Sequence, residues 1–76
     1  MDILALKKQY NQLLHRHNEG KLYIDNTNIP LADREKQIPL FIQICEKLND
    51  ILIELKKYNV KFTDEDVLTG FKEVQL

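Results

Sequence analysis

The feature that most constrains this chain is a run of apolar residues at helical spacing between Ile38 and Tyr58. On a wheel of 3.6 residues per turn they cover roughly 220° of the circumference, whereas an ordinary surface helix has an apolar arc of about 100°. The centre of the arc contains Phe41, Cys45, Leu48, Leu52 and Leu55. One flank contains Ile44, Ile51 and Tyr58, and the other contains Ile38, Ile42 and Ile53. Such a helix needs cover on several sides, which predicts contact with more than one neighbour.

The small size of the chain limits how it can be stabilised. Residues 1–76 make one small helical domain, and a domain of this size removes only about 60% of its unfolded surface from water. Small domains compensate with disulfides, metals or oligomerisation. Because Cys45 is the single cysteine, neither an intramolecular disulfide nor a thiolate metal cage can form. Oligomerisation remains, as does tight packing of a monomer.

The sequence has no feature that directs the chain to a membrane. No stretch approaches about 18 uninterrupted apolar residues, and the acidic start at Asp2 is unlike the basic start of a signal peptide. The net charge of −1, with 30% charged residues, is typical of an ordinary protein surface. The abundance of lysine, isoleucine and asparagine indicates an AT-rich genome. We therefore expect a cytoplasmic protein from a bacterium or phage.

The first predicted helix begins after Asp2, a residue type favoured at the N-cap. Its apolar stripe consists of Ile3, Leu6, Tyr10, Leu13, Leu14 and His17. Gly20 allows two interpretations: the helix ends at Glu19 with Gly20 in a left-handed conformation, or it continues to Ile24, which falls on the same stripe. We favour continuation, because the stronger turn sequence, Asp-Asn-Thr-Asn-Ile-Pro, follows at residues 25–30. The chain is expected to reverse direction there.

The second helix is expected to start at residues 30–31 and to end at residues 58–59. Pro39 lies inside it and removes one backbone hydrogen bond. Either the helix kinks near Lys36, or a short helix over residues 31–37 is followed by a new helix with Pro39 in its first turn. The helix axis must bend in both cases.

A third, short helix is predicted at about residues 64–71. Thr63 can accept a hydrogen bond from the third helical N–H, and the acidic residues 64–66 favour the positive end of the helix dipole. Its apolar face is expected to lie across the exposed side of the second helix. That face consists of Phe62, Val67, Leu68 and Phe71. Residues 72–76 are predicted to be a frayed tail.

Few residues suggest catalysis or metal binding. His15 and Glu19 lie one helical turn apart, but two ligands do not make a metal site. Cys45 lies at the centre of the apolar arc, where a cysteine behaves as a small hydrophobe rather than as a nucleophile. The loop at residues 25–30 lacks the glycine of a calcium-binding EF-hand. A small enzyme would have to use His15, Glu19 and Tyr23, so we expect a non-enzymatic protein with no catalytic, cofactor or metal site.

His17 lies in the middle of the apolar stripe of the first helix. It is interpreted either as a partly buried histidine that is hydrogen-bonded at the end of the helix, or as a pH-sensitive contact at an interface. The first interpretation is favoured.

A dimeric DNA-associated regulator is the alternative functional hypothesis. It would use basic residues of the first helix, namely Lys7, Lys8, Arg16 and Lys21. These residues do not form one row, and no aromatic residue is interleaved with them for base stacking. The last helix begins with three acids rather than with the basic residues of a recognition helix. Nucleic-acid binding is therefore the less favoured function.

The predicted fold class is all-α: an antiparallel helical hairpin, with its second helix kinked at Pro39, and a short C-terminal helix. Part of the wide apolar arc stays uncovered in such a hairpin, so a two-fold dimer with a four-helix arrangement is expected. The expected function is a protein–protein interaction module, a small regulator or adaptor that acts through an apolar face of the second helix. Its partner is a second copy, another protein, or both, with no membrane contact. The predicted interface residues are Ile42, Ile44, Ile51, Ile53 and Tyr58.

Overall fold

A computed structural model describes residues 2–74, which form three α-helices and no β-strand. The helices are α1 (Ile3–Asp25), α2 (Leu31–Lys57) and α3 (Asp64–Thr69). The all-α prediction is therefore confirmed for the described residues. None of these helices combines the length and the apolar character that crossing a membrane requires.

Helix α1 begins and ends close to where the sequence predicts. The Asp2 side chain caps it by accepting a hydrogen bond from the Leu4 N–H at 3.0 Å. The helix continues through Gly20 to Asp25, which confirms the favoured interpretation of this glycine. The position faces α2 closely, because a Cβ atom at Gly20 would lie 3.3 Å from Cδ2 of Phe41.

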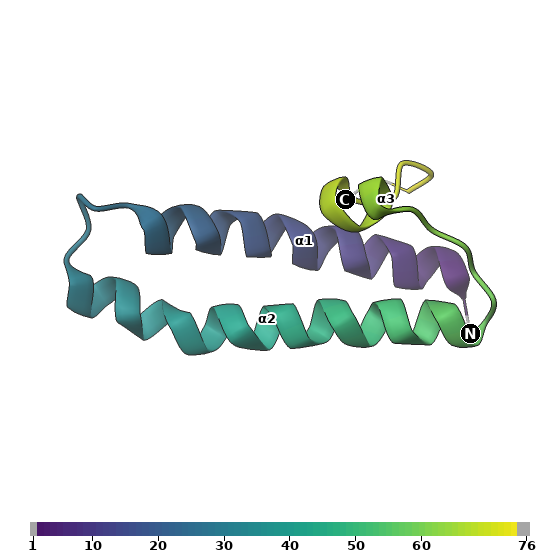
Figure 1. The fold of residues 1–76 in the computed structure, drawn as a ribbon, viewed down its shortest axis with the longest axis horizontal. Helices are drawn as coiled ribbons and strands as arrows, with labels where there is room; N and C mark the ends of the chain where they lie inside the picture. Colours follow the sequence, from purple (N-terminus) through teal and green to yellow (C-terminus); the bar gives the residue numbers. More distant parts are fainter. Residues whose placement is uncertain (1, 75–76) are drawn as a thin grey trace.

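Helix α2 is continuous through Pro39. The alternative of a separate short helix over residues 31–37 is therefore wrong. The proline ring removes only the hydrogen bond to the carbonyl of Glu35, and the turns on both sides keep theirs. In Figure 1 the first turns of α2 slope toward the axis of the remaining helix. A single lost hydrogen bond in a 27-residue helix changes its direction without ending it.

The two ends of α2 are fixed by different contacts. At the start, the Arg34 guanidinium donates to the carbonyl oxygens of Ile29 at 2.9 Å and Ile24 at 3.3 Å, and so ties α2 to the reversing loop. At the other end, Asn59 adopts a left-handed φ of 59°, and the Val60 N–H donates to a carbonyl of the last turn at 3.0 Å. Asparagine tolerates this conformation better than most residues.

Helices α1 and α2 lie side by side and run in opposite directions, in a molecule with extents of 43 × 19 × 18 Å (Figure 1). The buried apolar residues are Leu6, Tyr10, Leu13, Leu14, Leu48, Ile51, Leu55 and Phe71. All of them lie in residues 2–14 and 48–74, which we call the terminal half. No residue between 15 and 47, the loop half, is buried. The core is therefore confined to one end of the elongated molecule.

Helix α3 packs on α1 and not across the exposed side of α2, contrary to expectation (Figure 1). The Tyr10 hydroxyl donates to the Val67 carbonyl at 2.6 Å. The buried Phe71 ring meets Tyr10 edge-on at 5.4 Å and Phe62 at 6.2 Å between centroids. The side of α1 that Tyr10 presents therefore holds the third helix, because it offers both an aromatic surface and a hydrogen-bond donor.

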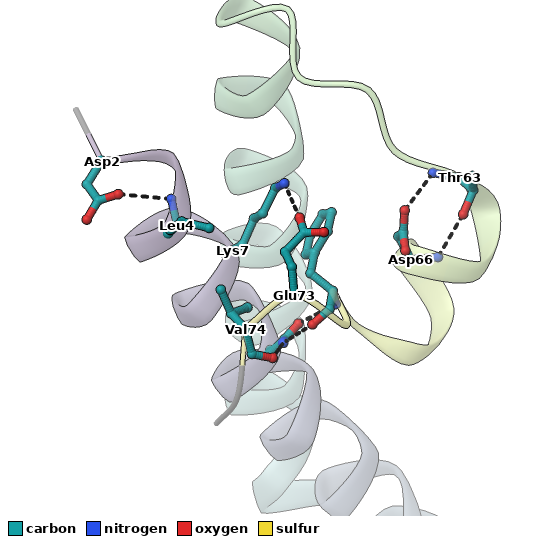
Figure 2. Close-up of polar contacts among 9 residues, drawn as sticks. Asp2, Leu4, Lys7, Thr63, Asp66, Glu73 and Val74 are labelled. Carbon is teal, nitrogen blue, oxygen red and sulfur yellow. Dashed lines mark hydrogen bonds and ion pairs between the residues drawn. The ribbon is translucent and has the colours of Figure 1, made fainter.

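The capping of α3 is as predicted, but its end is not. Thr63 accepts from the Asp66 N–H at 3.2 Å and its own N–H donates to the Asp66 carboxylate at 3.0 Å (Figure 2). The helix ends at Thr69, two residues before the predicted end at residue 71, because Gly70 takes a φ of 94°. This turn directs the following residue, Phe71, into the core.

Candidate interaction surface

The side of α2 that packs on α1 is displaced from the centre of its apolar arc. Leu48, Ile51 and Leu55 are 8%, 6% and 0% exposed, respectively. Ile44 is half-buried and packs against the same core. The hairpin thus uses the flank that contains Ile44 and Ile51. The wheel alone gives no means of choosing between the two flanks, because both are equally apolar.

The predicted interface residues therefore lie in different environments. Ile42 and Ile53 are 50% and 48% exposed and lie on the opposite flank. Tyr58 is 48% exposed at the end of α2. Ile51 belongs to the core, and Ile44 lies beside it. The first three side chains are accessible on the surface of one chain, whereas Ile51 is not.

The uncovered side of α2 has an apolar stripe interrupted by polar residues, which we call the exposed flank. It consists of the exposed residues Leu31, Ile38, Ile42 and Ile53. The half-buried Cys45 and Leu52 lie on its inner margin. The exposed polar residues Glu35, Asn49 and Lys56 alternate with the apolar ones along the same line. The spacing of three or four residues places all of these side chains on one side of the helix.

The other side of the hairpin is polar. An open groove between α1 and α2 is lined by Gln9, Gln12, Leu13, His15, Arg16, Lys47, Asp50 and Ile51. A second groove, nearer the loop, contains Glu19 and Tyr23 but not His15. The three residues considered for a small enzyme therefore do not line one groove. His15 and Glu19 pair at 2.9 Å, and no group of three or more potential metal ligands occurs among residues 2–74.

His17 contributes to the contact between the two long helices. Its ring stacks on Phe41 with centroids 4.7 Å apart and an interplanar angle of 28°. Its Nδ1 lies 3.2 Å from Oδ1 of Asn18. The half-buried, hydrogen-bonded environment is the one favoured from the sequence, although α1 does not end there. The sequence signal that was missed is the pairing of His17 and Gly20 with Phe41 across the hairpin.

The basic residues of α1 are dispersed. Lys7 pairs with Glu73 and lies 5.4 Å from the centroid of the Phe71 ring (Figure 2). Arg16 lines the polar groove. Lys8 and Lys21 are exposed elsewhere on the helix. One of the four is therefore already occupied by an intramolecular carboxylate.

The residues after α3 are held against α1 in an arrangement that we call the C-terminal clasp. The Asn11 amide accepts from the Phe71 N–H at 2.7 Å and donates to the carbonyls of Phe71 at 2.8 Å and Val74 at 3.2 Å. Glu73 pairs with Lys7 beside this contact (Figure 2). The prediction of a frayed tail is therefore wrong for residues 72–74, and residues 75–76 lie outside the described part. Asn11 was missed because it lies beside, not on, the apolar stripe.

The comparisons with known proteins give one similarity. The chain is 33% identical over 82 aligned residues to the human protein named "Putative E3 ubiquitin-protein ligase UBR7", and the match covers 99% of this chain. The chain spans only 18% of the length of that human protein. No family model and no solved structure matches the chain. The similarity therefore relates the chain to a segment of a much longer protein, without assigning it to a family.

Proposed function

We propose that this protein is a non-enzymatic protein–protein interaction module, a small regulator or adaptor that binds through the exposed flank of α2. The observation that supports the proposal is the exposure of Ile38, Ile42 and Ile53, at 39%, 50% and 48%, on one side of a helix whose other side is packed. Each square ångström of apolar surface removed from water is worth about 25 cal/mol. Exposed apolar residues that gather on one side of an element, beside charged residues, are typical of interaction sites.

The proposed partner is a second copy of the chain, another protein, or both. A second copy would place two hairpins face to face and form a four-helix arrangement around the two exposed flanks. Ile42 and Ile53 are the central interface residues of this proposal. Tyr58 belongs to the flank of Ile44 and Ile51, so it lies outside the contact in this arrangement. Ile44 and Ile51 would support the flank from the core.

The experiment is sedimentation equilibrium of the full chain over a hundredfold concentration range. The wild type is expected to exceed its monomer mass of 9.0 kDa as concentration rises. Ile42→Lys and Ile53→Lys should each abolish this association, because an unpaired charge would be buried in the interface. Leu68→Lys is the matched control, since Leu68 is 72% exposed on α3, away from the flank.

Two outcomes bear against the proposal. Flank variants that sediment like the wild type would show that the exposed flank is not the contact surface. A wild type that stays monomeric would remove the second copy as partner. In that case a photo-reactive residue at position 42 should cross-link the chain to a different protein in cells. If Ile53→Lys left this cross-link unchanged, the proposal would be wrong.

A DNA-associated regulator is the competing hypothesis. Arg16 and Lys47 line the same groove and are the observation in its favour. The pairing of Lys7 with Glu73 and the acidic first turn of α3 weigh against it. Retention on non-specific DNA that falls steeply with salt would support this function, because each neutralised phosphate adds to the salt dependence. An apolar protein interface has no such dependence.

A further inference from the structure

We propose that the partner of the exposed flank is a second copy of this chain, docked with the two α2 helices antiparallel and the two-fold axis passing between Cys45 and Glu46. This inference rests on the proposed function and specifies its partner, orientation and register. In this arrangement Ile38 faces Ile53 of the partner subunit. Glu35 faces Lys56 of the partner subunit.

The first argument is that the exposed flank is complementary to itself about one point. Ile38 and Ile53 lie equally far along α2 from the position between Cys45 and Glu46. The charged residues Glu35 and Lys56 are also equally far from that position, on opposite sides of it. A two-fold axis at this point therefore places Ile38 against Ile53 of the partner subunit and the two opposite charges against each other.

The second argument is that the end charges select one orientation. In a parallel pair, Glu35 would face Glu35 of the partner subunit and Lys56 would face Lys56 of the partner subunit, so like charges would repel. In the antiparallel pair each carboxylate faces an ammonium group, and the helix dipoles also oppose each other favourably. Both side chains are exposed, and no ion pair among residues 2–74 uses either of them. The Lys56 Nζ lies 5.9 Å from the centroid of the Phe62 ring, so it would have to turn from this ring toward the carboxylate of the partner subunit. In a contact between subunits, charges determine orientation more than affinity.

The third argument concerns the residues near the axis. Asn49 is exposed within the apolar line, and the axis sets it opposite Ile42 of the partner subunit. A single polar residue in an apolar helix interface fixes register at a cost in stability. Cys45, a small side chain on the inner margin, lies where the two helices would approach most closely.

The geometric test uses single cysteines on a Cys45→Ser background. Glu35→Cys chains alone should not be cross-linked by a short bis-maleimide, because antiparallel docking separates the two copies by about 30 Å at a rise of 1.5 Å per residue. Lys56→Cys chains alone should also fail to cross-link. An equimolar mixture of the two should give a covalent dimer within minutes. Leu68→Cys mixed with either one is the control for random collision.

The electrostatic test uses charge reversal on the intact chain. Glu35→Lys or Lys56→Glu alone should weaken dimerisation roughly three- to tenfold, since two equivalent pairs become repulsive. The double variant Glu35→Lys/Lys56→Glu should return to within about twofold of the wild type. Asp64→Lys, which changes a charge on α3, serves as the matched control and should leave dimerisation unchanged.

The outcomes separate this inference from the proposed function. Efficient cross-linking of Glu35→Cys to itself would show a parallel pair and overturn the inference, while a flank-dependent dimer would still support the interaction module. The inference would also be overturned if the double variant Glu35→Lys/Lys56→Glu dimerised more weakly than either single variant. A monomeric wild type would overturn the inference and leave a different protein as the only partner of the flank. If Ile42→Lys abolishes dimerisation and the mixture of Glu35→Cys and Lys56→Cys chains cross-links, both the proposed function and this inference are supported.

Discussion

The two halves of this hairpin consist of similarly apolar helical segments, but they differ in how many side chains are buried. The terminal half contains every buried apolar residue, whereas no residue of the loop half is buried. Exposed large apolar residues are instead frequent in the loop half: Leu22, Tyr23, Leu31, Ile38, Leu40 and Ile42. The difference lies in the number of layers, not in how apolar the helices are.

A third layer covers the terminal half only. Phe71 and the C-terminal clasp close the side of α1 that contains Tyr10, and the Phe62 ring seals the edge. The loop half has two layers, joined by the His17–Phe41 stack and by the hydrogen bonds of Arg34. Two helices can bury only one stripe each. A hairpin of this length therefore gains a true core only where a further segment, or a partner, is added.

The largest expected effect tests this contrast directly. Leu55→Ala removes a side chain that is 0% exposed, and should lower the free energy of unfolding by about 2–5 kcal/mol. Phe41→Ala removes a larger but half-buried side chain from the loop half, and should cost less. Urea unfolding at a concentration where the chain is monomeric gives both values. A greater loss for Phe41→Ala would show that the loop half carries the stability.

The next effect concerns the C-terminal clasp. Asn11→Ala removes three hydrogen bonds to the backbone of Phe71 and Val74, and should destabilise the chain by about 1–3 kcal/mol. Amide hydrogen exchange should become faster in residues 64–74 before it changes in α2. Gln12→Ala, at an exposed position of the same helix, is the control. Unchanged exchange at the clasp would mean that Phe71 holds the third layer without Asn11.

Much of the fold could be predicted from local sequence. Asp2, Thr63 and the loop at residues 25–30 act through neighbouring backbone groups, so their roles are readable from spacing alone. The continuation of α1 through Gly20 also followed from the phase of its stripe. The position of α3 could not be predicted in this way, because it depends on Tyr10 and Asn11 meeting residues about sixty positions away.

The sequence predicted that α2 would have an uncovered apolar surface, but not which side of the helix would carry it. The width of the apolar arc indicated that part of α2 would stay uncovered, and Ile42 and Ile53 were among the residues named. Ile51 was named as well, yet it is 6% exposed in the core. A wheel has no reference direction, so it shows how much of a helix is apolar without showing which flank the neighbouring helix covers.

A smaller effect is expected from Tyr10, at the centre of the terminal half. Burial raises the pKa of its phenol above the ordinary value, so the folded chain keeps the proton where the unfolded chain releases it. The resulting stability is complete below about pH 10 and is lost as pH rises through the folded pKa. Tyr10→Phe should remove this component.

That substitution should also cost about 1 kcal/mol at pH 7, through loss of the hydrogen bond to Val67. Unfolding free energies measured at pH 7 and pH 10.5 for both chains give the comparison. Tyr58→Phe is a suitable control, because Tyr58 is 48% exposed. If the wild type and Tyr10→Phe lost stability equally between the two pH values, the terminal half would be open enough for water to reach this phenol.

The smallest effect is expected at Gly20 and has the opposite sign. Alanine is favoured over glycine inside a helix by about 1 kcal/mol, but the new Cβ would lie 3.3 Å from Cδ2 of Phe41. Because the Phe41 ring is only half-buried, it can shift by a few tenths of an ångström, and Gly20→Ala should raise the thermal midpoint by a few degrees. Gly70→Ala is the counterpart in the terminal half, where a φ of 94° and an approach of 2.8 Å to Asn11 leave no room, so it should be destabilising. If Gly20→Ala were also destabilising, the loop half would be packed as tightly as the clasp, and the contrast between the two halves would have to be attributed to composition rather than to layers.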